Sequence, residues 1–111
     1  MVKDYIPHCG DLVWLNLDPS LGNEQGGRRP ALVLSSRVYN KIGLVVACPI
    51  TSQVKGYPFE VPISGKIHGA VLCDHVRNLD WTHRNIEFIQ TVPDALMTKV
   101  RGFLQKLILS A

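Results

Sequence analysis

The chain has 111 residues, of which 46% are hydrophobic and 19% charged, and its formal net charge at pH 7 is +3. This length favours one domain, and the composition excludes a disordered tail. The longest apolar run, residues 44–50, is interrupted by Pro49 and is far shorter than the roughly 20 residues of a membrane-spanning helix. We therefore expect one globular domain over residues 1–111 that does not enter a membrane.

Cysteine and histidine usage predicts neither disulfides nor a metal site. Cys9, Cys48 and Cys73 are odd in number and lack a Cys-x-x-Cys spacing, and the four histidines are scattered. No apolar signal segment follows Lys3, so a cytoplasmic location with reduced thiols is expected. The modest positive charge is compatible with a polyanionic partner but does not identify one.

Short apolar segments separated by glycine and proline turns predict a mainly β fold. Both faces of the first segment are apolar as far as Asn16, so that strand is expected to be covered on both sides. Residues 78–85 are polar around Trp81 and carry no strand prediction. The predicted strands span 11–17, 31–35, 44–50, 59–63, 69–73 and 86–89.

A single helix is predicted at the C-terminal end. Thr91, Val92, Pro93 and Asp94 have the pattern of a helix start, with proline and an acidic residue in the first turn. The residues that follow form one wide apolar stripe, which we expect to face the core. Its members are Leu96, Met97, Val100, Phe103, Leu104, Leu107 and Ile108. The fold class is therefore mainly β with a C-terminal α-helix (α+β), arranged as a small barrel or sandwich.

Three segments outside this scaffold are candidates for function: residues 22–31, 49–52 and 55–59. The first is a polar, glycine-rich loop, and such loops often carry function. Individually each is a weak signal, because a glutamate beside arginines in a loop is usually a solvated charge cluster.

Taken together, these segments resemble the MazF/PemK toxin family, the RNA-cleaving partners of bacterial toxin–antitoxin pairs. The resemblance is closest to the MazF branch, whose loop looks like Lys55-Gly56-Tyr57-Pro58-Phe59. It covers most of the chain in the same order and spacing. The matching segments are residues 10–14, 18–19, 22–25, 29–35, 39–40, 49–52, 55–61 and 69–77.

The resemblance implies an SH3-like β-barrel of the CcdB/MazF/PemK type that works as a homodimer. It also implies a metal-independent, sequence-specific endoribonuclease without a cofactor, which cuts single-stranded mRNA and leaves a 2′,3′-cyclic phosphate and a 5′-hydroxyl. The implied partner is a MazE-like antitoxin with an acidic C-terminal segment.

Glu24, Arg29 and Thr51 match the family's proposed catalytic residues. Cleavage by a 2′-hydroxyl needs a group that accepts its proton and donors that stabilise the charged phosphorane. Glu24 is the natural base if it is partly buried. Arg29 offers a fork of donors to phosphate oxygens and, as a strongly basic guanidinium, acts as a stabiliser rather than a ready acid. Thr51 would orient the phosphate, although without the resemblance a strand-end hydroxyl bonded to backbone is the simpler interpretation.

RNA contacts are expected from the two loops on which these residues lie. Because adjacent strand residues point to opposite sides, Arg28 is expected to be a surface charge that helps to hold the RNA backbone. Tyr57 and Phe59 are candidates for base stacking. Because Phe59 alternates with Val61, a core position for Phe59 is an equally good interpretation. The RNA-binding candidates are Asn23, Gln25, Arg28, Ser52, Lys55, Tyr57, Phe59 and Asp74.

Asp74 matches a proposed active-site aspartate of the PemK branch. The catalytic histidine of that branch, however, lies where this sequence has Asn23, which shifts the role of base to Glu24. His75 and Arg77 are nearby alternatives. Trp14 is expected to be structural, and Trp81 is a candidate for the dimer or antitoxin surface.

Two alternative functions use the same fold. A non-catalytic, CcdB-like toxin depends on a Trp-Gly-Ile-type C-terminal end, whereas this chain ends in residues 107–111, Leu-Ile-Leu-Ser-Ala. A plain RNA-binding barrel would not need Glu24, Arg29 and Thr51 together.

Overall fold

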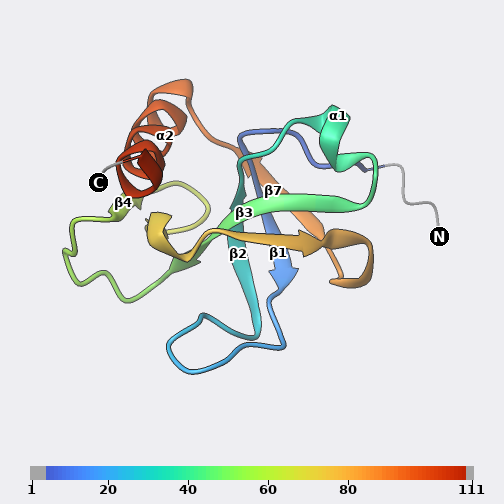
Figure 1. Ribbon diagram of the computed structural model, residues 1–111, viewed down its shortest axis with the longest axis horizontal. Coiled ribbons are helices and arrows are strands. Elements are labelled where there is room, and N and C mark those ends of the chain that lie inside the picture. Colours follow the sequence, from blue (N-terminus) through green and yellow to red (C-terminus); the bar gives the residue numbers. More distant parts are fainter. Residues whose placement is uncertain (1–4, 110–111) are drawn as a thin grey trace.

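The computed structural model describes residues 5–109, which form one antiparallel seven-stranded sheet and a long C-terminal helix. The strands are β1 (Asp11–Asn16), β2 (Arg28–Val33), β3 (Leu44–Thr51), β4 (Glu60–Ile63), β5 (Gly69–Leu72), β6 (Arg77–Asp80) and β7 (Glu87–Thr91). Their order is β4-β5-β3-β2-β1-β7, and β6 pairs with the first half of β3 on the edge opposite β2. The predicted class, mainly β with a C-terminal helix, is confirmed (Figure 1).

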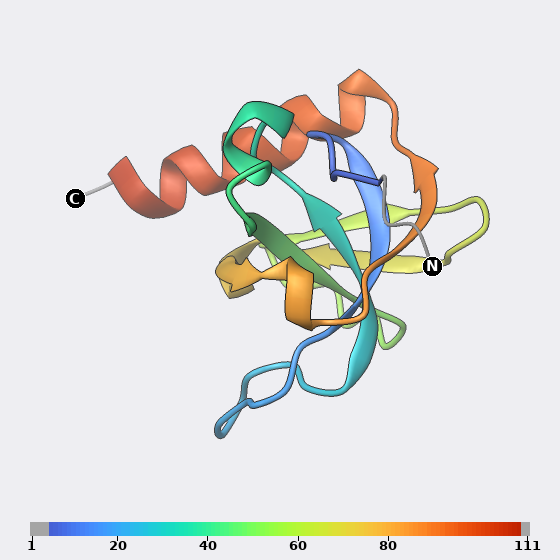
Figure 2. The same cartoon turned by 90° about the vertical axis from the view of Figure 1, so that its right-hand side faces the viewer.

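The helix α2 (Asp94–Leu109) covers one side of the sheet. Figures 1 and 2 both place it at the end of the molecule opposite the long loop between β1 and β2. The first half of the predicted stripe is core, with Met97 and Val100 buried. The last turn is not: Leu107 and Ile108 are exposed in the single chain, so the expectation that the whole stripe faces the core is wrong there.

Two apolar clusters lie on the two faces of the central strands. Leu12 of β1 belongs to the cluster beneath α2, while Val13 and Leu15 belong to the other cluster. Alternate residues of β1 therefore enter different cores, which confirms that both faces of this strand are covered. Burial of apolar surface on both sides holds the central strands in register.

The structure adds elements that the sequence pattern did not predict. The short helix α1 (Arg37–Asn40) begins at Ser36, whose side chain accepts a hydrogen bond from the amide of Tyr39. β6 lies within the segment that was left without a strand prediction, and 3₁₀ turns η1 (Cys73–His75) and η2 (Trp81–His83) flank it. β2 begins three residues earlier than predicted, at Arg28.

Trp81 is a core residue, and its prediction as a dimer or antitoxin contact is wrong. The side chain is 9% exposed and packs in the cluster that contains Val13. Its Nε1 donates to the carbonyl of Asn40 at 2.8 Å. The side-chain amide of buried Asn40 donates to the carbonyls of Pro7 and Ser35. The backbone carbonyl of Asn40 thus gives the buried indole N–H a fixed hydrogen-bond partner.

Neither helix in the described part of the chain has the length and apolar composition needed to cross a membrane.

Candidate functional site

The loop between β1 and β2 projects from the barrel and is held at its base by arginines from distant segments. The amide of Leu17 donates to the carbonyl of Gly27 at 2.8 Å, which closes the loop. Arg77 Nη1 donates to the carbonyl of Leu17 at 2.7 Å, and Arg84 Nη1 donates to that of Asp18 at 2.8 Å. The base of the loop is therefore fixed, while its tip remains exposed.

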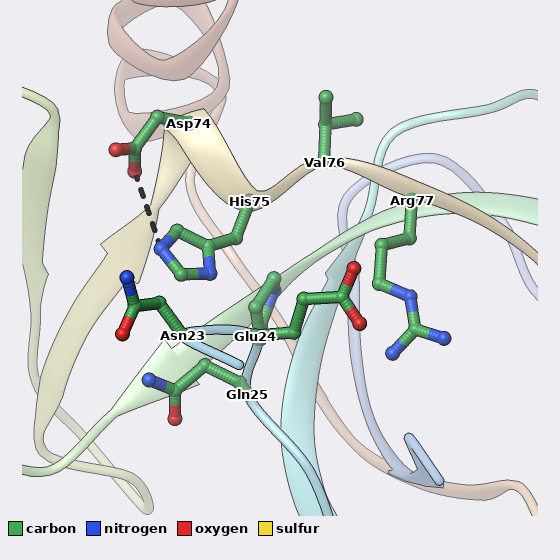
Figure 3. Close-up of a pocket in the computed structure, with 8 residues that line it drawn as sticks. Asn23, Glu24, Gln25, Asp74, His75, Val76 and Arg77 are labelled. Atoms are coloured by element: carbon green, nitrogen blue, oxygen red, sulfur yellow. Dashed lines mark ion pairs between the residues drawn. The ribbon is translucent and has the colours of Figure 1, made fainter. Parts of the chain in front are cut away.

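Glu24 lies near the tip of this loop. Its side chain lines a cavity of about 280 Å³ with Asp74, His75 and Arg77, which come from η1 and β6 (Figure 3). Glu24 Oε1 accepts a hydrogen bond from the amide of Leu21 at 2.8 Å, and the residue is exposed. The partial burial expected of a strong base is thus absent in the single chain.

Arg29 lies at the start of β2, opposite Leu15 of β1. Its Nε donates to the carbonyl of Gly26 at 2.7 Å, and neither Nη atom makes a hydrogen bond within the described residues. Arg29 lines a different cavity from Glu24, together with Ser52. The free end of the guanidinium is available to an anion.

Arg28 is tied to the barrel instead. Its guanidinium donates to the carbonyl of Asn85, forms an ion pair with Glu87 at 3.0 Å and lies 5.9 Å from the centre of the Trp14 ring. The two arginines therefore differ, as the alternation of strand side chains predicts. Asn85 and Glu87 thus hold the Arg28 guanidinium against the barrel, and its remaining N–H donors are the ones left for the RNA backbone.

A third cavity, of about 400 Å³, lies where the β1–β2 loop meets the loop between β3 and β4. Both loops contribute to it, so the two loops meet there. Thr51 lines this cavity but is only 8% exposed. Its Oγ1 accepts the amide of Gln53 at 3.1 Å, as in the simpler interpretation of a strand-end hydroxyl. Six of the RNA-binding candidates line the same cavity: Asn23, Gln25, Lys55, Tyr57, Phe59 and Asp74.

Phe59 lines that cavity too, yet it is partly buried and packs edge-on against Phe103 of α2, with 6.3 Å between ring centres. Tyr57 is 60% exposed, and Lys55 Nζ lies 6.0 Å from the centre of its ring. Tyr57 is therefore the better placed aromatic for stacking, and Phe59 mainly supports the loop.

Glu60 was missed by the sequence analysis. Its carboxylate accepts the amides of Lys55 at 3.0 Å and Gly56 at 2.8 Å. Gly56 has φ of +77°, a conformation that favours glycine, so the chain turns sharply around this carboxylate. The available signal was an acidic residue shortly after Gly56, at the end of a polar loop.

The catalytic candidates are close in the fold but do not converge on one cavity. Glu24, Arg29 and Thr51 line three neighbouring cavities around the β1–β2 loop. The cavities of Glu24 and Thr51 share Asp74 and His75, while that of Arg29 lies on the other side of the loop.

Thiol and metal chemistry have little support at this site. Cys73 is buried beneath Asp74, and burial, with a smaller contribution from the Asp74 charge, raises the pKa of its thiol to about 11. Burial also raises the pKa of Cys48. Both thiols are therefore protonated and poor nucleophiles near neutrality. Within residues 5–109, no group of three or more His, Cys, Asp or Glu side chains is arranged to hold a metal ion.

Comparison with known proteins identifies the family. Residues 8–108 match the model of the PemK-like, MazF-like toxins of type II toxin–antitoxin systems. The chain belongs to this family. The Escherichia coli K12 endoribonuclease toxin MazF is 42% identical over 110 residues, which cover 97% of this chain and 99% of the relative. The E. coli K12 endoribonuclease toxin ChpB is 35% identical over 115 residues, covering 97% and 99%.

Solved structures of the family have the same fold. MazF from Deinococcus radiodurans superposes with a TM-score of 0.91 at 52% identity, covering 95% of this chain and 98% of that one. A MazE–MazF complex from the same organism matches with a TM-score of 0.86 at 50% identity, covering 97% and 100%. The predicted MazF-type barrel and the family assignment are both confirmed.

Proposed function

We propose that this MazF-family protein is an endoribonuclease toxin that cuts single-stranded RNA without a metal ion and is neutralised by a MazE-like antitoxin with an acidic C-terminal segment. The observation that carries the proposal is the meeting of two polar loops, in a chain that resembles named endoribonucleases along nearly its whole length. One loop carries Glu24 and leads into β2 at Arg29, and the other follows Thr51. A cytoplasmic location, where RNA and reduced thiols occur, agrees with this activity.

In the proposed reaction, Glu24 accepts the proton of a ribose 2′-hydroxyl. The 2′-oxygen then bonds to the adjacent phosphorus, and the bond from phosphorus to the 5′-oxygen breaks. The products are a 2′,3′-cyclic phosphate and a 5′-oxygen that takes a proton from water. The free Nη atoms of Arg29 stabilise the added negative charge on the phosphorane, and Thr51 orients the phosphate.

Assembly of this site requires the β1–β2 loop to move. Glu24 must release the amide of Leu21, and RNA must bring the cavities of Glu24 and Arg29 together across the loop. Because the tip of the loop is exposed, few apolar contacts oppose that movement.

The functional unit is proposed to be a homodimer. The last turn of α2 supports this, because Leu107, Ile108 and Leu109 are 41%, 70% and 71% exposed and form an apolar surface without a partner in the single chain. Sedimentation of the wild-type protein and of Ile108→Asp tests the assignment. A wild-type dimer that the substitution converts to a folded monomer is expected, and a monomeric wild type refutes it.

Cleavage in a buffer containing EDTA tests the activity and its chemistry together. The wild type should produce RNA fragments with 5′-hydroxyl ends, and a 2′-deoxy substitution at the cut site should stop the reaction. Glu24→Ala and Arg29→Ala should each lower the rate by about 10²–10⁴-fold with unchanged circular dichroism. The control is Asp94→Ala, which removes an exposed carboxylate on α2.

Two results contradict the proposal. RNA binding by the wild type without cleavage over a long incubation identifies a plain binding barrel. Full activity of both Glu24→Ala and Arg29→Ala refutes the mechanism, while an absolute requirement for a divalent ion refutes its metal independence.

A further inference from the structure

The cavity lined by Arg29 is separate from the one at the meeting point of the two loops. Its volume is about 540 Å³, and it lies between Trp14 of β1, the start of β2, the end of β3 and the β4–β5 turn. Trp14, Arg28, Lys66 and His68 line it, and Ser52 connects it to the neighbouring Thr51. Neither Lys66 nor His68 was expected to contribute to function.

Trp14 forms a fixed wall of this cavity. On β1 it lies opposite Pro30 of β2, and it is only half-buried. The Arg28 guanidinium rests 5.9 Å from its ring centre and is itself held by the ion pair with Glu87. These contacts orient a partly exposed indole, whereas the other tryptophan, Trp81, is 9% exposed and packs in the core. Trp14 thus has the expected structural contacts and is also partly exposed where it lines the cavity.

The charge around this wall is positive. Arg28, Arg29 and Lys66 line the cavity, and none of its lining residues carries a carboxylate. The cavity of Thr51, by contrast, contains Glu60 and Asp74 beside Lys55. Arg28 is neutralised by Glu87, but Arg29 keeps two Nη atoms and Lys66 keeps most of its donors.

Lys66 is placed by the turn that carries it. Its amide donates to Gln90 Oε1 at 3.0 Å, and Nζ makes a long contact of 3.4 Å with the carbonyl of Ile89. The turn between β4 and β5 is thereby bridged to β7, and Lys66 is among the residues that line the cavity. An oriented aromatic face with nearby cations suits a nucleotide, because the base stacks and the phosphate is neutralised.

We propose that this cavity is a nucleotide subsite, in which one base of single-stranded RNA stacks on Trp14 while Lys66 contacts the adjoining phosphate. Through Arg29 and Ser52 the subsite continues from the proposed cleavage site, so it rests on the proposed function for its place along the RNA. RNA binding at the subsite does not require that the RNA be cleaved. His68, on the same rim, lies within the subsite and adds donors for the strand.

Tryptophan fluorescence tests the subsite without turnover. The probe is a mixed-sequence single-stranded RNA of about 12 nucleotides with 2′-O-methyl groups throughout, which no 2′-hydroxyl can cleave. Binding should quench the wild-type emission, and Trp14→Phe should abolish most of the quenching while it retains binding by stacking. Trp14→Leu should weaken binding by at least about fivefold, if its melting shows that it folds.

The contribution of Lys66 is measured by the dependence of binding on salt. Lys66→Ala should weaken binding and lower the slope of log K against log salt by about 0.7, the value for one phosphate contact on a single strand. Lys41→Ala is the matched control, because it removes an exposed lysine just after α1, at the opposite end of β3. Its slope should equal that of the wild type.

Three outcomes would overturn the subsite. They are RNA binding without quenching of Trp14, equal slopes for Lys66→Ala and the wild type, and quenching by an acidic peptide but not by RNA. The third result would assign the cavity to a peptide partner. Quenching and a Lys66-dependent slope in a protein that cuts no unmodified RNA would instead support the subsite while refuting the proposed nuclease, so the two failures are distinguishable.

Discussion

Glu60 provides a test of whether the loop between β3 and β4 must be held in place for RNA to bind. Glu60→Ala removes the acceptor of the amides of Lys55 and Gly56, which lie 3.0 and 2.8 Å from its carboxylate. Hydrogen bonds to a charged group contribute about 1.5–3 kcal/mol each, but these exposed amides regain water when the carboxylate is lost. A net cost of about 1 kcal/mol in ordering the loop corresponds to about a fivefold change in affinity.

The direction of the change in RNA affinity shows whether Glu60 acts by positioning the loop or by its negative charge. Glu60→Ala also removes a negative charge beside the RNA path, which by itself would tighten RNA binding. If the carboxylate positions the loop, KM rises about fivefold and kcat stays within about twofold. Glu60→Gln keeps an acceptor of roughly half the strength, so KM should rise only about twofold.

Initial rates on a fluorogenic oligonucleotide, which carries a cut site mapped from 5′-hydroxyl ends, give kcat and KM separately. The Asp94→Ala variant again controls for the loss of an exposed carboxylate. An unchanged or lower KM for Glu60→Ala would refute the positioning role, and so would a fall confined to kcat.

Three further predictions concern stability and thiol chemistry. Gly69→Ala should lower the free energy of unfolding by about 1–3 kcal/mol, because a Cβ there would lie 2.1 Å from the carbonyl oxygen of Thr51. Gly102→Ala in α2, where a Cβ meets nothing within 4 Å, should raise the free energy of unfolding by up to about 1 kcal/mol. Thermal melting of the two variants and the wild type measures both changes. The folded protein should react with a thiol reagent at exposed Cys9 alone, with Cys48 and Cys73 reacting only after denaturation, and rapid labelling of all three would contradict the described burial. Since burial raises the pKa of Cys73 from 9.0 to about 11, the unfolded state ionises first and stability should fall as the pH rises from about 9 to 11; urea titrations should show a smaller fall for Cys73→Ala than for the wild type.

The proposed catalytic residues differ in how far their local contacts resemble a working site. The Nη atoms of Arg29 make no hydrogen bond within the described residues, while Glu24 is bound to its own loop and Thr51 is almost buried. RNA binding would therefore have to reorganise the carboxylate more than the guanidinium. Replacing either group tests its role. Slower movement of the loop is expected to limit proton transfer to Glu24 more than phosphate binding by Arg29.

The sequence alone determined the elements that depend on local patterns. The alternation in 11–17 predicted a strand covered on both faces, and the helix start at Pro93 and Asp94 was placed within a few residues of α2. Turn residues and apolar periodicity suffice there, because the signal lies within one segment. The order of motifs along the chain was enough to indicate the MazF/PemK family, and with it the candidate roles of Glu24, Arg29 and Thr51.

Tertiary structure decided what those side chains contact. β6 carries little apolar pattern of its own and forms because β3 offers it a partner strand. Trp81 is buried because Asn40, 41 residues earlier, accepts its indole hydrogen bond. Arg28 and Arg29 are adjacent and chemically identical, yet Glu87 and Asn85 engage the guanidinium of Arg28, while the Nη atoms of Arg29 make no hydrogen bond within the described residues. Contacts between distant segments depend on register and chain crossing, which a local pattern does not encode.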